Sequence, residues 1–309
     1  MKAGVVSIIG RPNAGKSTLL NRIIGEKIAI VSDKPQTTRT RILGTKNYPE
    51  EPASPKHPQG AEAGQIAFVD TPGIHRPLHR MNVRMVDAAV ETLREVDAVM
   101  YVHDASTRTG HGDEYVSNLL KHVKIPVVLV LNKIDLIAKS KLLPLIDQLR
   151  QWRDFSDIVP VSAATGDGVE GLERILLGKM PEGEPLYPDD FLTDQPQRVI
   201  ASETVREKVL LHTRAELPFS TAVVVDKFEE PDEGGLLRLY CSILVERESQ
   251  KPIVIGRRGD MIRTIGTAAR LELERFFDTR VFLDLHVKVK GEWREDDRVL
   301  DEMMKTPRS

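Results

Sequence analysis

The most chemically specific residues of this chain form a loop suited to binding phosphate. Residues 10–17 read Gly-Arg-Pro-Asn-Ala-Gly-Lys-Ser, and in this spacing backbone N–H groups surround an anion at the start of a helix. Lys16 can reach the outer phosphates of a nucleotide, and Ser17 can hold Mg²⁺ through its hydroxyl. An apolar run at 5–9 and a helical pattern at 18–24 flank the loop, a context that an ordinary glycine turn does not need. The predicted nucleotide-binding residues here are Gly10, Asn13, Ala14, Gly15, Lys16, Ser17 and Thr18.

A second motif, Asn-Lys-Ile-Asp at 132–135, specifies the base of the nucleotide. Guanine presents a ring N–H and an exocyclic amine side by side, and the Asp135 carboxylate can accept both hydrogen bonds. Adenine lacks this pair of donors and would leave the carboxylate desolvated and unpaired. The motif at 162–163, Ser-Ala, follows another apolar run and can offer a backbone N–H to the guanine oxygen. The sequence therefore predicts a guanine site that contains Asn132, Lys133, Asp135, Ser162 and Ala163.

A third element, Asp-Thr-Pro-Gly at 70–73, lies between the other two along the chain. Asp70 would orient Mg²⁺ or its waters, and Gly73 can donate its backbone N–H to a γ-phosphate. Loss of that phosphate on hydrolysis would release the segment that follows. The next residue, Ile74, has no hydrogen-bonding group with which to position an attacking water. His75 is an alternative general base, although a loop histidine is more often simply exposed.

With these motifs in this order, the chain resembles the translation-factor-related GTPases, and most closely the Era family. Three further stretches carry the resemblance: residues 34–39, residues 215–220, and residues 244–251 followed by Ile-Gly-Arg-Arg-Gly at 255–259. The resemblance covers nearly the whole chain. It implies a Mg²⁺-dependent GTPase that binds GTP and GDP. It also implies that a C-terminal KH domain binds the 3′ end of 16S ribosomal RNA during assembly of the small (30S) ribosomal subunit.

The resemblance also implies which residues hold the metal and take part in hydrolysis. The implied metal ligands are Ser17, Thr38 and Asp70. The implied catalytic residues are Lys16, Thr38 and Gly73. Thr37 is the alternative to Thr38, because two adjacent threonines cannot be separated from sequence. Asn13 would help to bind K⁺, as the equivalent asparagine does in related GTPases, or would only stabilise the loop through a side-chain hydrogen bond.

A local basic stretch surrounds a Gly-x-x-Gly at 256–259, although the net charge of the whole chain is −2. The two glycines would let the backbone pass close to a sugar-phosphate chain, and the arginines between them would supply charge. KH folds clamp about four nucleotides of single strand in this way. A turn with exposed arginines is the alternative. The predicted RNA-binding residues are Lys251, Gly256, Arg257, Arg258, Gly259 and Arg263.

The elements that must position these motifs fall into two domains. Residues 1–180 alternate strand and helix patterns, which predicts an α/β, doubly wound P-loop GTPase sheet. The proline-rich and acidic residues 181–196 predict an extended linker. Residues 197–309 predict an α+β KH domain of type II-like order with a C-terminal tail. Residues 49–64 are punctuated by prolines and predict an exposed insertion in a β-hairpin, to which we assign no function.

Composition limits the remaining classes. The net charge of −2 argues against indiscriminate affinity for nucleic acids. The single cysteine, Cys241, alternates with apolar residues, so it is expected in a core, and it excludes an intramolecular disulfide. No signal peptide and no membrane span are expected, and these features suit the cytoplasm. Peripheral attachment to the inner face of the cell membrane is implied by the resemblance alone.

Three other functional classes fit less well. A tRNA-modification GTPase would need a C-terminal cysteine motif, which this chain lacks. A ribosome factor with two GTPase domains is excluded by the single phosphate loop. A non-enzymatic adaptor, whose second domain binds protein, would be separated from the leading hypothesis by a turnover assay and an RNA pull-down.

Overall fold

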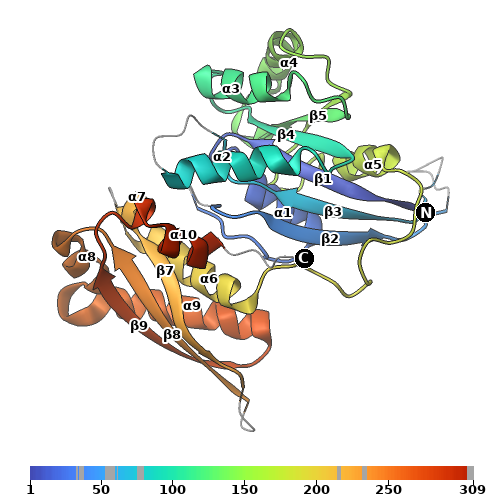
Figure 1. The fold of residues 1–309 in the computed structure, drawn as a ribbon. Coiled ribbons are helices and arrows are strands. Elements are labelled where there is room, and N and C mark those ends of the chain that lie inside the picture. Colours follow the sequence, from blue (N-terminus) through green and yellow to red (C-terminus); the bar gives the residue numbers. More distant parts are fainter. Residues whose placement is uncertain are drawn as a thin grey trace. The chain divides into compact units, whose positions relative to one another are not determined.

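Two compact units make up the structure, a computed structural model (Figure 1). One lies within residues 1–194, and the other is formed mainly by residues 195–304. The structure describes residues 1–32, 34, 38–52, 60, 62–74, 80–213, 217–231 and 235–304.

A six-stranded sheet, in the order β2-β3-β1-β4-β5-β6, forms the centre of the first unit. All neighbouring strands are parallel except β2, which pairs antiparallel with β3 as the hairpin predicted around residues 49–64. The carboxyl ends of the parallel strands therefore meet at one edge, where ligands bind in folds of this class. The strands are β1 (Lys2–Gly10), β2 (Ile42–Tyr48), β3 (Gly64–Asp70), β4 (Ala98–Asp104), β5 (Val127–Asn132) and β6 (Asp157–Pro160).

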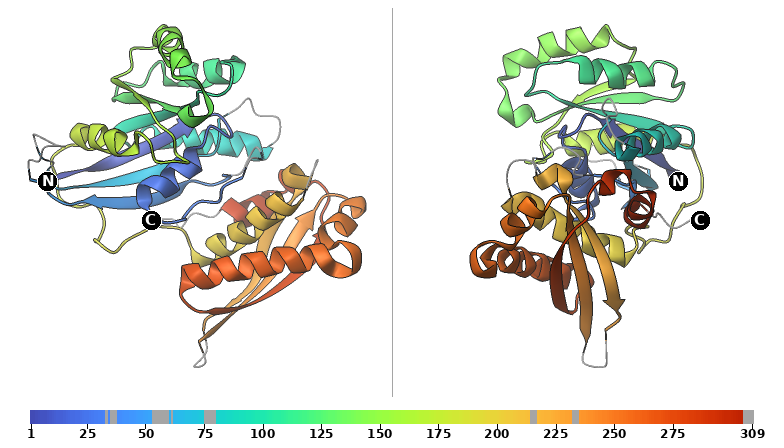
Figure 2. Two further views of the ribbon diagram at one scale, coloured as in Figure 1. Left: turned by 180° about the vertical axis from the view of Figure 1, so that it is seen from behind. Right: turned by 60° about the vertical axis from the view of Figure 1, so that its left-hand side comes forward.

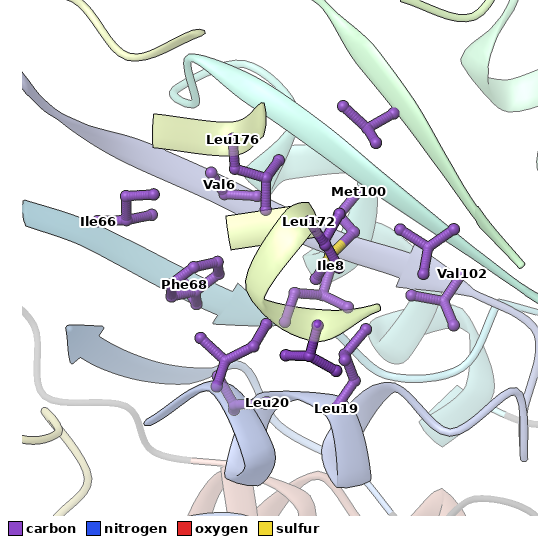
Figure 3. Close-up of a cluster of buried hydrophobic side chains, with 14 of the residues drawn as sticks. Val6, Ile8, Leu19, Leu20, Ile66, Phe68, Met100, Val102, Leu172 and Leu176 are labelled. Atoms are coloured by element: carbon purple, nitrogen blue, oxygen red, sulfur yellow. The ribbon is translucent and has the colours of Figure 1, made fainter. Parts of the chain in front are cut away.

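Helices cover both faces of this sheet because its strands are apolar on both faces. In β1, Val6 and Ile8 point into one core with the α1 and α5 helices, and Ile9 points into another with α2, α3 and α4. Figure 3 shows the first core, where Leu19 and Leu20 of α1 meet the sheet. The predicted doubly wound fold is confirmed. The helices are α1 (Lys16–Ile24), α2 (Arg80–Thr92), α3 (His111–Leu120), α4 (Leu142–Arg150) and α5 (Val169–Lys179).

Most of the predicted linker is bound to the first unit. The buried side chain of Gln65 accepts hydrogen bonds from the backbone N–H groups of Leu186 and Tyr187, at 2.7 and 2.9 Å, and donates one to the Tyr187 carbonyl at 2.8 Å. Further along, the Thr45 N–H donates to the Leu192 carbonyl at 3.1 Å. These contacts extend the first unit to residue 194. The domain limits of 1–180, 181–196 and 197–309 stay a prediction.

The second unit packs two long helices, α6 and α9, on one face of a three-stranded sheet in the order β7-β8-β9 (Figure 2). The β7 and β8 strands are antiparallel, whereas β8 and β9 are parallel, which agrees with the predicted KH order. Cys241 of β8 is fully buried as predicted, and burial raises the pKa of its thiol to about 12. The elements are α6 (Gln197–His212), α7 (Leu217–Ser220), β7 (Ala222–Glu229), β8 (Leu236–Val245), α8 (Lys251–Ile255), α9 (Asp260–Phe277), β9 (Arg280–Val289) and α10 (Asp297–Met304).

The predicted C-terminal tail contains regular structure as far as Met304. Trp293 is fully buried, and its indole N–H donates to the Ser220 carbonyl at 3.0 Å. Val299 and Leu300 of α10 are also buried. The sequence did not predict this helix, because eight residues are too short a pattern to read. Across the described residues, every helix is too short or too polar to cross a membrane.

Candidate functional site

The phosphate-binding loop lies where β1 ends and α1 begins. Asn13 and Gly15 have left-handed backbone angles, with φ of 63° and 89°. A Cβ atom on Gly15 would lie 2.2 Å from the Asn132 amide nitrogen, so this position excludes any side chain. Ala14 is buried, and Thr18 is half-buried at the start of α1. The loop therefore has the bend that its sequence predicted, and packing against the base motif fixes it.

Lys16 lies folded back across this loop. Its ammonium group donates to the carbonyls of Gly10 and Arg11, at 3.3 and 3.0 Å. The residue is 5% exposed, and burial lowers its pKa, although the charge of Asp70 opposes this shift. A cation removed from water in this way is suited to an anionic ligand.

Three oxygen-bearing side chains meet beside Lys16, and they are the three predicted metal ligands. The Ser17 hydroxyl donates to Asp70 Oδ2 at 2.6 Å and lies 2.7 Å from the Thr38 hydroxyl, which is 3.4 Å from the same carboxylate oxygen. Thr37, the alternative to Thr38, lies outside the described residues.

The other oxygen of Asp70 is what makes this cluster fit a metal ion. Asp70 Oδ1 is buried and has no hydrogen-bond partner among the described residues. Burial raises the pKa of Asp70, and Lys16, the two hydroxyls and the backbone N–H of Thr71 oppose the rise. Hard oxygen ligands around an unsatisfied carboxylate oxygen are what Mg²⁺ prefers.

The segment after Asp70 packs directly on the phosphate loop. A Cβ atom on Gly73 would lie 2.7 Å from Pro12 Cα, so Gly73 must lack a side chain. The Ile74 N–H donates to the Gly10 carbonyl at 3.1 Å, and the Ile74 side chain is fully buried in the core. Ile74 therefore cannot reach an attacking water, in agreement with the sequence. His75 lies outside the described residues.

The base motif joins three loops. The Asn132 side chain donates to the Ala14 carbonyl and accepts from the Ala163 N–H, both at 2.9 Å. The Lys133 ammonium group donates to the Asn13 carbonyl at 2.8 Å. Asp135 is exposed, and its carboxylate is accessible to a base. Asn132 and Lys133 therefore hold the phosphate loop in place, whereas recognition of the base by Asp135 stays a prediction.

The sequence predicted that a backbone N–H group of the Ser162-Ala163 loop binds the guanine oxygen. The two backbone donors of this loop are already used within the protein, because the Ser162 N–H bonds to the Asp167 carbonyl at 2.8 Å and the Ala163 N–H to Asn132. A contact between this loop and the guanine oxygen stays a prediction. Arg22 of α1 fixes the loop by donating to the Ala163 carbonyl at 3.1 Å.

Asp104 supports the site and was missed from the sequence. It ends β4 beside Asn132 of β5, and its carboxylate accepts from the Lys133 ammonium group at 2.6 Å. Burial alone would raise the pKa of Asp104, but hydrogen bonds from Lys133 and Ser106 outweigh it and lower the pKa. Asp104 is thus an ionised anchor for Lys133. Its position at the end of a parallel strand was the signal that could have identified it.

In the second unit, the Gly-x-x-Gly loop connects α8 to α9. Gly256 and Gly259 have φ of 76° and 78°, and Arg258 has φ of 51°. A Cβ atom on Gly256 would lie 2.6 Å from the Met261 backbone nitrogen, so the loop needs glycine there. The predicted cations lie around the loop, with Lys251 half-buried and Arg257, Arg258 and Arg263 exposed.

An open groove of about 430 Å³ adjoins this loop, between α9 and β9. Gly266 lies in the middle of α9, and a Cβ atom on it would approach the Leu285 side chain to 3.4 Å. Arg270 is fixed by hydrogen bonds to both carboxylate oxygens of Glu274, at 2.7 and 2.8 Å. Apart from Gly259 and Arg263, the sequence did not assign the lining residues to a site. The lining residues are Gly259, Ile262, Arg263, Gly266, Thr267, Arg270, Leu283 and Leu285.

Gln250 connects two of the stretches that carry the family resemblance, residues 215–220 and 244–251. The side-chain oxygen of Gln250, Oε1, accepts from the N–H groups of Glu246 and Arg247, at 2.9 and 3.0 Å. Its side-chain nitrogen, Nε2, donates to the Ser220 hydroxyl at 2.9 Å. One buried side chain thus fixes the residues that lead into α8 and Lys251.

Comparison with known proteins agrees with this architecture. Residues 5–133 match the family model described as "50S ribosome-binding GTPase", and residues 216–294 match the KH domain model. GTPase Era of Geobacter metallireducens is 48% identical over 98% of this chain and 97% of its own length. GTPase Era of Geobacter sp. strain M21 is 49% identical over 97% of each chain.

Two solved structures are similar over the full length. An Aquifex aeolicus Era variant bound to GDP and AlF₄⁻ is 40% identical, with a TM-score of 0.90 over 98% of this chain and 99% of that one. Era in complex with MgGDPNP and nucleotides 1506–1542 of 16S ribosomal RNA is also 40% identical, with a TM-score of 0.91 over 98% of both chains.

We predict that Asp104→Asn weakens guanine nucleotide affinity about tenfold, which corresponds to the loss of one partly buried ion pair of about 1.4 kcal/mol. Lys133 would lose its charged partner and hold the Asn13 carbonyl less firmly. The measurement is GDP binding by calorimetry. Ser106→Ala, which removes another hydrogen bond from Asp104 but leaves Lys133 in place, is the control and should stay near wild type. Equal affinity in Asp104→Asn and wild type would contradict the anchoring role.

Proposed function

We propose a function for this chain from one premise: it belongs to the Era family of GTPases. We propose that it hydrolyses GTP to GDP and phosphate, and that the bound nucleotide controls binding of the second unit to the 3′ end of 16S ribosomal RNA during assembly of the small ribosomal subunit. The cluster of Ser17, Thr38 and Asp70 beside the buried Lys16 is the observation that carries the enzymatic part.

In the proposed site, Ser17, Thr38 and Asp70 hold Mg²⁺, which supplies positive charge at the outer phosphates when bound. Lys16 exchanges its carbonyl partners for phosphate oxygens and stabilises the charge that develops on the leaving group. The Gly73 N–H donates to the γ-phosphate, so the segment after it responds to hydrolysis. The positions of these groups around one carboxylate oxygen that lacks a partner among the described residues support this assignment.

The residue that follows Gly73 has no side-chain group that could activate the attacking water. Ile74 is buried and carries no polar group, so the attacking water is oriented by backbone groups, Mg²⁺ and a monovalent cation. Hydrolysis is therefore slow without a partner. Asn13 is an exposed residue of the phosphate loop and would contribute to a K⁺ site.

For the second unit, we propose that a single RNA strand passes over Gly256 and Gly259 and that its bases enter the groove between α9 and β9. The related Era structure with nucleotides 1506–1542 supports this choice of RNA. We propose that the protein binds this RNA in the cytoplasm. We identify no residue in the described ranges that would carry the peripheral membrane association implied by the resemblance, and we leave it out of the proposal.

Base choice is expected to depend on Asp135. In Asp135→Asn, the amide can donate to the C2 carbonyl oxygen of xanthine but can no longer accept both guanine hydrogen bonds. GTP affinity should fall on the order of a hundredfold, and xanthosine triphosphate should become the preferred ligand. Competition binding with both nucleotides measures this change. A variant that keeps full preference for GTP would show that the base site is wrongly assigned.

K⁺ is expected to stimulate GTP hydrolysis more than Na⁺ does, if Asn13 helps to hold the ion. Turnover is measured in matched K⁺ and Na⁺ buffers, with Asn13→Ala compared in both. The variant should lose the difference between the two ions. Equal wild-type rates in the two buffers would remove the role of Asn13 in ion binding and leave the GTPase assignment intact.

RNA binding is expected to depend on the charge of the Gly-x-x-Gly loop and on the open groove. Arg257→Asp combined with Arg258→Asp should reduce affinity for a short single strand matching the 16S 3′ end about a hundredfold, with a shallower salt dependence. Gly266→Val fills the groove without changing charge, so it should weaken binding and leave the salt slope unchanged.

GTP binding by the same preparations is the control, because these substitutions lie in the second unit. Unchanged RNA affinity in the folded charge variant would contradict the assignment of this loop to RNA.

A further inference from the structure

Asp113, near the start of α3, is a buried carboxylate that no nucleotide-binding motif contains. Its side chain is 2% exposed. Its Oδ2 accepts from the Arg11 guanidinium at 2.5 Å and from the Gly110 N–H at 3.0 Å. Its Oδ1 lies 3.2 Å from Nδ1 of His103, whose side chain is fully buried. One carboxylate thus connects β4, α3 and the phosphate loop.

The groups around Asp113 stabilise the charge of its carboxylate. Burial alone would raise the pKa of Asp113, but His103, Arg11 and the Gly110 N–H outweigh burial and lower it. Nδ1 of His103 faces this carboxylate from β4. The Arg11 guanidinium is the permanent positive charge in contact with this carboxylate.

Arg11 is the residue through which Asp113 can affect the nucleotide. It is the first residue after Gly10 in the phosphate loop. Its carbonyl accepts from the Lys16 ammonium group at 3.0 Å and from the Ala14 N–H at 3.3 Å. A Cβ atom on Gly112 would lie 3.1 Å from Arg11 Nε, so the start of α3 leaves room for the guanidinium. The backbone of Arg11 therefore belongs to the phosphate loop, while its side chain is held by α3.

We propose that Asp113 is a positioning residue for the nucleotide: by holding the Arg11 side chain, it fixes the phosphate loop and slows nucleotide dissociation. This inference rests on the proposed GTPase function. Asp113 touches neither phosphate nor metal in this arrangement, and its effect passes entirely through Arg11. The ion pair acts beside the anchor formed by Asp104 and Lys133, so the last two residues of β4, His103 and Asp104, support the loop at separate points.

A purely structural role is the competing explanation, because Asp113 also bonds to the Gly110 N–H at the N-terminus of α3. A double-mutant cycle separates the two roles, since only residues that act through each other give effects that do not add. Asp113→Asn removes the counter-charge from Arg11. Arg11→Met keeps the apolar stem of the side chain and removes the charge, while Asp113 keeps its contacts with His103 and Gly110.

The experiment measures dissociation of a fluorescent GDP analogue, displaced by excess GDP, from the full chain. Each single variant should release the analogue about tenfold faster than wild type, as expected for about 1.4 kcal/mol of lost interaction. The double variant should also be about tenfold faster, because the second substitution has nothing left to remove. Arg11→Lys should fall between wild type and Arg11→Met.

Asp97→Asn is the matched control. Asp97 accepts a hydrogen bond from the Val5 N–H at 2.8 Å. This substitution therefore weakens β1, the strand that leads into the phosphate loop, at a point outside the loop. It should lower the melting temperature and leave the dissociation rate unchanged. Equal acceleration by Asp97→Asn would overturn the proposal, because the effect would then be general loosening of the unit.

Two other outcomes would also overturn it: wild-type dissociation in folded Arg11→Met, or a double variant about a hundredfold faster than wild type. If Asp113→Asn does not fold, Arg11→Met and Arg11→Lys alone decide the question. Failure of the proposed function is distinguishable, because wild-type protein would then not bind the analogue at all.

Discussion

The nucleotide site depends on two opposite charges, Lys16 and Asp70, that the sheet removes from water at its carboxyl edge. Removing ions from water costs on the order of several kcal/mol each, and mutual attraction offsets only part of this. Burial shifts the pKa of both groups toward their neutral forms, and Asp70 keeps an oxygen without a partner among the described residues. A phosphate and a divalent cation would supply the missing interactions. The fold is thus arranged for charges that its ligands bring.

The surrounding structure keeps this arrangement in place without touching the ligand. Asn132 binds the Ala14 carbonyl, and Lys133 binds the Asn13 carbonyl. The base motif therefore fixes the phosphate loop through contacts within the protein. Asp104 in turn fixes Lys133. A loop held at several backbone atoms loses little conformational freedom when a nucleotide binds, which favours affinity.

Much of the fold and the primary site could be predicted from the sequence, because these signals are local. The phosphate loop needs its glycines within eight residues, and Cys241 shows its burial through its neighbours in one strand. Asp104 offers only its place at the end of a strand, and Asp113 has no local signal at all. Their partners lie 29 and 102 residues away along the chain, so only the strand order brings them together. Leu283 and Leu285 illustrate the same limit: their alternation predicts an inward face, but only the packing shows that this face ends in an open groove.

Glycine serves two different physical needs in the two units. Gly15 and Gly256 occupy left-handed conformations in places where a Cβ atom would collide with neighbouring groups, so they are required by the protein itself. Gly266 is different, because its helical backbone would accept alanine and its Cβ atom would meet Leu285 only at 3.4 Å. A glycine inside a helix lowers stability by about 1 kcal/mol relative to alanine. Packing does not require that loss, and in the proposed function the space that Gly266 leaves in the groove accommodates a base of the bound RNA.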